Sequence, residues 1–444
     1  MTIAQDTSET PINDKDLLSG FVRGGFYSWT DPIDDKIYVS SAFSDFGLKL
    51  ETADESFFKA FADVRFRYGS EFQKPVSRFD LREAYVGING QKWDLSVGQK
   101  IIKWGRCDFT NPTSKLSPQN MISRSPDRED MNMANLLASF GLHPSSFMDI
   151  RAVVIPYYRS SVLIIDPVPL PEYVTIKQID AIITDKEMIS YGLKADFHLR
   201  GLDMALSWFD GYDPMPGIEL SEFSMDFTQL LPVISAGLNV RPYKIRMFGL
   251  DFETALNAVC LRGEAAWTKP YPDHQTREYV PMPEIKWVAG IDWTSGIWRF
   301  TGEYSGKYVG DFYSITADSF IGAEPDFSKI AAMLEIPGFD ISEYFKQQVG
   351  AFNRLYNYQM KEFAHSAGLK TEGEFAYGRL LPSVTALYNF SYRDLMIMPE
   401  IKAKPRDGLT ITAGAEIYTG RKNSLYDLID DFMNGVYVSL RIDF

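Results

Sequence analysis

The sequence predicts an all-β protein, a transmembrane antiparallel β-barrel. Segments of about ten residues alternate between apolar and polar side chains from Ser19 to Phe444, which is typical of strands with two different faces. Aromatic residues make up 14% of the chain, and they gather on the apolar face near strand ends, as in the aromatic girdles of membrane barrels. Short and long connections also alternate. The alternative is a soluble antiparallel sheet with one face in water.

The alternation is clearest in two segments. Between residues 189 and 200, one face carries Ile, Tyr, Leu, Ala, Phe and Leu, and the other carries Ser, Gly, Lys, Asp, His and Arg. The last strand, 436–444, places Val, Val, Leu, Ile and Phe opposite Tyr, Ser, Arg and Asp. Successive side chains of a strand point to opposite faces, whereas a helix would need a period of about 3.6 residues. These segments are therefore expected to be strands.

The connections give a strand count. Short turns are expected near 53–55, 89–92, 143–145, 200–203, 256–258, 294–296, 376–378 and 405–408. Longer connections are expected near 30–36, 69–76, 105–131, 159–187, 210–243, 269–280, 307–356, 393–394 and 420–434. Eight turns and nine longer connections join 18 strands, and 16 is the alternative if one hairpin is misread. An even count returns both termini to the same side, which is the periplasmic side in bacterial barrels.

One barrel accounts for nearly the whole chain. Residues 19–444 are expected to form it, after a flexible periplasmic segment over residues 1–18. Short helices are expected in the longest outer loop, at 327–334 and 341–349, where the apolar residues follow a helical period. No linker-like stretch divides the chain.

Composition excludes several classes of function. The chain has 45 basic and 59 acidic residues and a net charge of −14, so we expect no nucleic-acid partner. The two cysteines, Cys107 and Cys260, are expected to be free thiols. The four histidines occupy isolated positions without metal-binding spacing, and no nucleophile or phosphate-binding motif is present. We therefore expect no enzyme, no metal site and no cofactor.

Charged residues recur on the polar face of the strands, which faces the lumen of a barrel. They would either pair with one another and stiffen the wall or line an aqueous path. The expected function is passive diffusion of small polar or charged solutes through a polar lumen constricted by long loops. A barrel with a closed lumen, acting as an anchor or subunit of a complex, is the alternative. The pore-lining candidates are Arg65, Arg67, Arg82, Arg151, Lys194, Asp196, Arg200, Arg262, Glu264, Lys286, Asp292, Arg299, Glu303, Lys370 and Glu372.

The outer loops carry most of the negative charge. The segment 210–226 has five acids and no base, and it is expected to contribute an acidic vestibule that could hold a divalent cation. Two loops, 162–187 and 307–356, are too apolar for solvated tips. They are expected to constrict the lumen or to dock a partner protein or lipid. The vestibule residues are Asp210, Asp213, Glu219, Glu222 and Asp226.

Three stretches resemble known outer-membrane proteins. The final strand ending in Phe444 resembles the signal that the barrel-assembly machinery recognises in its clients. The segment VGQKIIKWGR at 97–106 with Asn111-Pro112, and GLDF at 249–252 with LRGEAAW at 261–267, resemble porin-like barrels of the alginate-export type from Gram-negative bacteria. The resemblance implies an 18-stranded channel in the outer membrane, in contact with outer-membrane lipid and lipopolysaccharide. It does not transfer alginate as a substrate, because the inward positions here carry both signs of charge.

Overall fold

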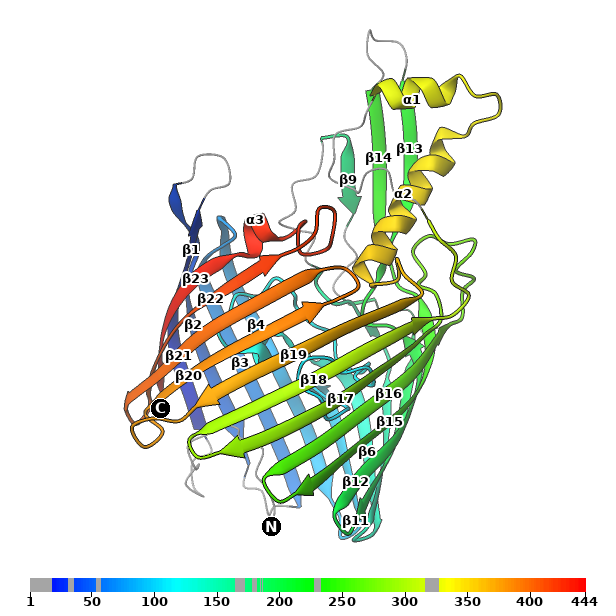
Figure 1. Cartoon of the computed structure of the whole chain (residues 1–444). Coiled ribbons are helices and arrows are strands. Elements are labelled where there is room, and N and C mark those ends of the chain that lie inside the picture. Colours follow the sequence, from blue (N-terminus) through cyan, green and yellow to red (C-terminus); the bar gives the residue numbers. More distant parts are fainter. Residues whose placement is uncertain are drawn as a thin grey trace.

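The computed structural model describes residues 18–30, 36–52, 57–163, 172–177, 182–183, 185, 187–226, 233–315 and 327–444, and in it 18 antiparallel strands form one closed sheet (Figure 1). The barrel strands are 8 to 16 residues long. In chain order the barrel strands are β1 (Leu18–Thr30), β2 (Ile37–Glu51), β3 (Phe58–Glu71), β4 (Lys74–Asn89), β5 (Trp93–Lys100), β6 (Asn135–Ser145), β7 (Met148–Ile155), β11 (Ser190–Leu199), β12 (Leu202–Tyr212), β15 (Lys244–Leu256), β16 (Val259–Pro270), β17 (Glu284–Ser295), β18 (Trp298–Val309), β19 (Phe363–Gly373), β20 (Leu380–Asn389), β21 (Asp394–Arg406), β22 (Leu409–Thr419) and β23 (Gly435–Asp443).

The predicted count of 18 strands is confirmed, and the alternative of 16 is wrong. The tight 393–394 connection is a genuine turn: Asn389 pairs with Asp394, and Arg393 adopts a left-handed φ of 62°. The ladder closes between β1 and β23, where Gly20 and Phe444 exchange two backbone hydrogen bonds of 2.8 and 2.9 Å. Both ends of the described barrel therefore lie at the end with the short turns, which we name the turn end; the opposite end is the loop end.

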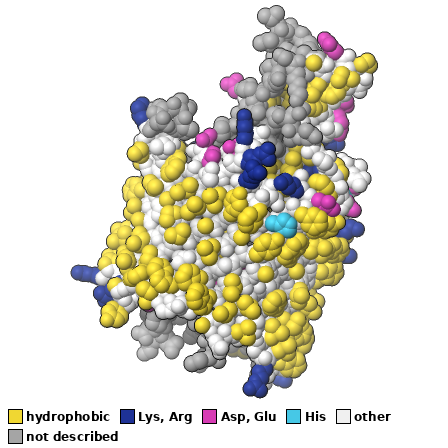
Figure 2. All heavy atoms as spheres, in the orientation of Figure 1, with side chains coloured by type: hydrophobic (Ala, Val, Ile, Leu, Met, Phe, Trp, Pro, Cys, Tyr) yellow, Lys and Arg dark blue, Asp and Glu magenta, His cyan; other side chains and the backbone are white. Residues whose placement is uncertain are grey.

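The outward face of the barrel is a continuous apolar surface, as Figure 2 shows for one side. On β1, for example, Val22 and Phe26 are 47% and 63% exposed, while the alternate residue Arg23 is 2% exposed and points inward. A soluble sheet would place its apolar face in the core instead. Because an apolar band of this kind matches the hydrocarbon layer of a membrane, the soluble-sheet alternative is rejected.

Above the loop end, the long connections form a separate layer. A small sheet of β9 (Val174–Lys177), β13 (Gly217–Asp226) and β14 (Val233–Arg241) rises beside helices α1 (Phe327–Leu334) and α2 (Ile341–Tyr356) (Figure 1). The remaining short elements are β8 (Tyr158–Arg159), β10 (Ile182–Ile183) and α3 (Asp430–Met433). The two predicted helices are confirmed. The second begins at its N-cap Asp340, which accepts hydrogen bonds from Ser342 and Glu343, and it runs to Tyr356, beyond the predicted end.

The apolar residues of these long loops pack mainly against one another. Ile218 and Leu238 of the small sheet form a buried cluster with Val349 and Phe352 of α2, and Leu163 and Ile176 pack against it. Burial within this cluster accounts for the apolar residues of the two loops that take part in it. Residues 164–171, 178–181 and 316–326 of these loops lie outside the described residues, so the expected constriction of the lumen by the loops stays a prediction.

No helix in the described part of the chain is long and apolar enough to cross a membrane. Residues 1–17 lie outside the described residues, so the flexible N-terminal segment stays a prediction.

We predict that Phe444→Ala lowers the yield of folded barrel more than it changes the properties of the barrels that do form. The ring of Phe444 stacks on Phe46 at 6.4 Å between centroids, beside the seam where the barrel closes. Heat-modifiable mobility on gels measures the folded fraction. Phe58→Ala, an exposed aromatic at the turn end away from the seam, is the matched control. Equal folded fractions for Phe444→Ala and the parent would contradict the prediction.

Candidate functional site

The candidate site is a segment that crosses the interior of the barrel. Residues 101–134, between β5 and β6, contain no barrel strand and only one short helix, η1 (Arg128–Met131); we name them the lumen segment. Their side chains and backbone contact inward residues of β1, β3 and β4 on one side and of β15, β16 and β18 on the other. In the cyclic order of 18 strands, β16 is nine places from β2, so these two walls face each other.

Apolar packing attaches the first half of the lumen segment. Trp104 and Leu116 are 3% and 1% exposed and pack in the largest buried cluster of the barrel interior. Their partners are inward residues of β6, β7, β12, β15 and β16, which interrupt an otherwise polar lumen face. The cluster is completed by Leu137, Val153, Ile155, Phe209, Tyr243, Ile245, Met247, Ala266, Tyr279 and Val280.

Two buried glutamates of the wall bind backbone N–H groups of the lumen segment. Glu264 on β16 accepts hydrogen bonds from the N–H and hydroxyl of Thr113 (2.7 and 2.8 Å) and from the N–H of Arg106 (3.2 Å). Glu303 on β18 accepts from the N–H groups of Asp108 and Phe109 (2.6 and 3.1 Å). Hydrogen bonds to an ionised carboxylate are stronger than neutral ones, so these contacts fix the course of a segment that has no sheet partner.

Ion pairs reinforce this side. The Arg106 side chain donates to Asp251 of β15 at 2.6 Å, and Asp251 is fully buried. Arg262 of β16 donates to the carbonyl of Arg106 (2.7 Å) and pairs with Asp108 and Asp292, both at 2.8 Å. In the first of these ion pairs the lumen segment supplies the cation, Arg106, and in the second the wall supplies it, Arg262.

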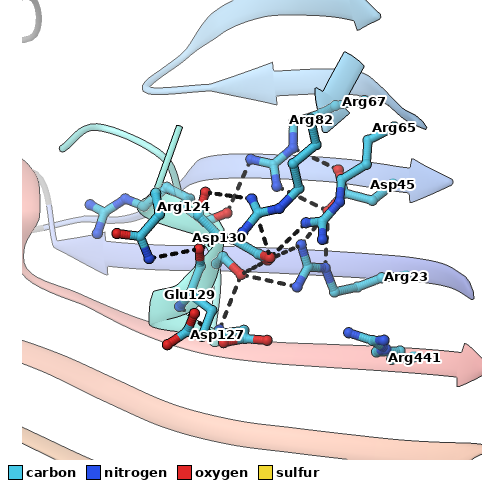
Figure 3. Close-up of polar contacts among 12 residues, drawn as sticks. Arg23, Asp45, Arg65, Arg67, Arg82, Arg124, Asp127, Glu129, Asp130 and Arg441 are labelled. Carbon is cyan, nitrogen blue, oxygen red and sulfur yellow. Dashed lines mark hydrogen bonds and ion pairs between the residues drawn. The ribbon is translucent and has the colours of Figure 1, made fainter. Parts of the chain in front are cut away.

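On the opposite wall, three arginines converge on one carboxylate of the lumen segment (Figure 3). Asp130 in η1 accepts from Arg23 of β1 at 2.8 Å and from Arg65 of β3 at 2.6 Å. Arg82 of β4 donates to the carbonyls of Asp130 and Glu129 at 3.2 and 2.6 Å. Burial alone would raise the pKa of the Asp130 carboxyl, but the positive charges of Arg23 and Arg65 outweigh it and hold that pKa well below its usual range.

A second layer stands behind these contacts. Asp45 of β2 bridges Arg23 (2.7 Å) and Arg67 (2.6 Å), and Arg67 also donates to the carbonyl of Arg124. Arg124 is 1% exposed; it pairs with Glu416 of β22 at 2.6 Å and donates to the carbonyls of Phe432 and Met433. Arg124 therefore ties the lumen segment to the loop before β23.

The structure places the predicted pore-lining residues in three groups. Arg65, Arg67 and Arg82 lie around Asp130, whereas Arg262, Glu264, Asp292 and Glu303 hold the other side of the lumen segment, with Asp196 3.7 Å from Arg106. Lys194, Lys286 and Lys370 instead pair with carboxylates along the wall, the last with Glu372. Arg200 and Arg299 are exposed near the turn end, and Arg151 pairs there with Asp94.

The five predicted vestibule acids do not meet on one surface. Asp210 and Asp213 are buried and paired, Asp210 with Lys244 and Arg246 and Asp213 with Lys115. Glu219, Glu222 and Asp226 lie on β13 above the rim, and Glu219 pairs with Arg241. Among the described residues, no group of three His, Cys, Asp or Glu side chains is arranged to hold a metal ion. The acidic vestibule stays a prediction, and these cations reduce its charge.

The sequence suggested that the four histidines are isolated, but His143 and His198 are linked through the carboxylate of Asp149. His143 bridges Asp94 (2.9 Å) and Asp149 (2.6 Å), and His198 bridges Asp149 (3.0 Å) and Asp203 (2.8 Å). The five residues lie on five neighbouring strands, β5, β6, β7, β11 and β12. Two of the contacts cross a hairpin, between residues 6 and 5 apart, and two join residues 49 apart, so the strand register is needed to bring the whole group together.

Sequence reasoning missed Arg23, Asp45, Arg124, Asp130 and Asp251 as site residues. A signal for the lumen segment was present: the 105–131 connection is long and rich in charge, and its start carries the Trp104-Gly105-Arg106 motif. Gly105 adopts a φ of 88°, and a Cβ there would lie 2.1 Å from the Asn111 side-chain oxygen. The motif therefore marks the turn into the lumen. Cys107 lies in this segment, and both cysteines are free thiols, as expected.

Comparisons with known proteins give structural likeness only. No protein-family model matches the chain. No curated protein matches it at a significant level either. Among solved structures, a BenF-like porin from Pseudomonas fluorescens Pf-5 matches with a TM-score of 0.53 and 9% identity over 97% of this chain and 98% of its own. OpdK of Pseudomonas aeruginosa with vanillate matches with a TM-score of 0.53 and 8% identity over 97% of this chain and 98% of its own. OccAB3 of Acinetobacter baumannii matches with a TM-score of 0.51 and 10% identity over 96% of this chain and 98% of its own.

The match covers nearly all of each chain, while the identity is too low to carry residue roles from one protein to another. What it shows is architecture: this chain has the closed-barrel fold of the porins.

Proposed function

We propose that the protein is a passive channel of the bacterial outer membrane, through which small polar or charged solutes diffuse past the lumen segment. The observation that carries the proposal is the attachment of residues 101–134 to both walls of a wide barrel. An 18-stranded barrel is too wide for wall side chains to fill. A segment held across the interior divides that space and leaves charged groups along the remaining path.

The apolar outward band and the position of the start of β1 and the end of β23 at the same end of the barrel support placement in the outer membrane with the turn end in the periplasm. The resemblance of 97–106 to alginate-export barrels has a structural counterpart, since this motif turns the chain into the lumen. It carries no proposal for alginate, because both acids and bases surround the lumen segment. Vanillate is present in the OpdK structure and is not assigned to this protein; we propose only that this channel takes solutes of comparable size.

The alternative function, a closed barrel that anchors a complex, is favoured by one observation. The loop layer of β9, β13, β14 and α2 has its own buried core and stands above the rim, where a partner protein could dock. Planar-bilayer recordings separate the two functions. Stepwise conductance from the purified monodisperse barrel supports the channel; folded barrel that never conducts supports the anchor.

We predict that Asp130→Asn makes the channel more selective for anions. The substitution keeps the shape of the side chain but removes the negative charge that faces Arg23, Arg65 and Arg82, so these arginines attract anions more strongly. Reversal potentials in a salt gradient measure the change. Asp407→Asn, in the β21–β22 turn, changes net charge equally but lies far from the lumen segment. An equal shift in both variants would contradict the prediction.

We also predict that Arg124→Ala loosens the lumen segment. It removes the buried cation that pairs with Glu416, whose side chain is 16% exposed, a change that costs up to about 3–5 kcal/mol in a fully buried pair. The free energy of unfolding in lipid vesicles should fall by up to that amount, and the open-channel current should fluctuate more. Lys103→Ala is the control, because Lys103 belongs to the same segment but is exposed and pairs with Glu129, which is also exposed, rather than with a wall residue. Unchanged current noise in Arg124→Ala would show that the segment needs no such anchor.

A further inference from the structure

Three rows of outward-facing side chains cross β12, β15 and β16 near the loop end. The first row is aromatic: Trp208, Phe248 and Trp267 are register neighbours, and the rings of Phe248 and Trp267 stack at 5.9 Å. Phe248 is 50% and Trp267 40% exposed. Aromatic residues at this height are typical of the boundary between hydrocarbon and headgroups.

The second and third rows are cationic. One step toward the loop end, Asp210, Arg246 and Lys269 lie side by side on the same three strands. One step further, Lys244 pairs with Tyr212 in register and lies beneath the ring of Tyr271, 5.0 Å from its centroid. Lys244 and Arg246 share the carboxylate of Asp210, so three cations face one anion. The Arg246 side chain remains 46% and that of Lys244 36% exposed.

A cavity of about 780 Å³ opens directly above these rows. Tyr212 and Lys244, the last pair of the β12–β15 ladder, line its lower edge. The rest of its wall comes from the base of the β13–β14 hairpin, the β16–β17 loop and the start of α2, and it mixes polar side chains such as Thr276 with apolar ones such as Leu220 and Phe223. It holds three further cations, Arg241, Arg277 and Lys346, and three acids, Glu219, Glu222 and Glu278. Glu219 pairs with Arg241, and Lys346 lies 3.9 Å from Glu278, so together with Lys244 the wall keeps an excess of one positive charge.

We propose that this surface binds the headgroup of a phosphorylated glycolipid in the outer leaflet. The aromatic row sets the depth of the acyl chains, the cation rows lie where the phosphates of such a lipid would be, and each basic residue near a charged lipid surface contributes to binding. The cavity has the volume of a typical small-molecule site, which a sugar headgroup fills and a bare phosphate does not. The proposal rests on the membrane placement proposed above but not on conduction.

The first experiment measures binding of lipid A, the bisphosphorylated glucosamine-disaccharide lipid, to the full-length barrel in detergent by native mass spectrometry. The triple variant Lys244→Gln, Arg246→Gln, Lys269→Gln should bind lipid A at least about tenfold more weakly than the parent. The control triple variant, Lys92→Gln, Lys404→Gln, Arg406→Gln, removes the same charge at the turn end and should bind as the parent does. Equal affinity of the two triple variants overturns the proposal.

The second experiment separates the sugar from the phosphate. Thr276→Trp fills the cavity without changing charge, so it should weaken binding of lipid A but leave binding of phosphatidylglycerol unchanged. Dephosphorylated lipid A and inorganic phosphate should each bind the parent more weakly than intact lipid A. If Thr276→Trp leaves lipid A binding intact, or phosphatidylglycerol binds as well as lipid A, a glycolipid site is contradicted.

Bilayer conductance of the same variants distinguishes a failure of the lipid-binding proposal from a failure of the channel proposal. Because the three rows lie outside the lumen, the triple variant should conduct as the parent does while losing lipid. A non-conducting parent that still binds lipid A would reject the channel and leave the lipid site standing.

Discussion

The attachment of the lumen segment to two facing walls is the contact on which the remaining arrangement depends. A closed sheet satisfies its own backbone hydrogen bonds, but residues 101–134 contribute no strand to the barrel sheet and form only isolated bridges, Gln119 to Asn132 and Asn120 to Val162. Their backbone groups must find other partners, because unpaired polar groups are costly where water is scarce. Glu264 and Glu303 accept four of the N–H and hydroxyl donors near Thr113 and Asp108, and Arg262 and Arg82 donate to carbonyls of the segment.

The two walls hold the segment by different combinations of contacts. Toward β6–β18, Trp104 and Leu116 bury apolar surface, and Glu264, Glu303 and Asp251 add hydrogen bonds and an ion pair. Toward β1–β4, the attachment is almost wholly ionic and centred on Asp130, with Asp45 keeping Arg23 and Arg67 in place behind it. Most of these charged side chains are buried, with exposures of 3% for Arg23, 8% for Asp130 and 19% for Arg65. In the proposed channel they would act on a solute through their field rather than by direct contact, so the contacts that position the segment would also influence selectivity.

The barrel could be predicted from sequence almost completely, because its rules are local. The period of two fixes which side chains face outward, and the alternation of short and long connections fixes the count of strands. The site could be predicted only in part. The sequence identified several inward residues, namely Arg65, Arg67, Arg82, Glu264 and Glu303, but it did not identify the lumen segment as their common partner. The contacts join residues far apart in the chain: Asp130 lies 65 residues from Arg65, and Arg106 lies 158 residues from Glu264. The packing of the outer loops could not be predicted for a similar reason. Apolar residues of different loops pack against one another, and the sequence of a single loop does not show which surface its apolar residues will contact.

The most direct test of the central claim is the single-channel conductance of a barrel in which residues 106–130 are replaced by a short Gly/Ser turn. Removing the segment widens the narrowest part of the path, so conductance should rise by a factor of about two or more, and heat-modifiable mobility confirms that the variant is folded. A folded variant with the conductance of the parent would contradict the account, because the narrowest point would then lie elsewhere.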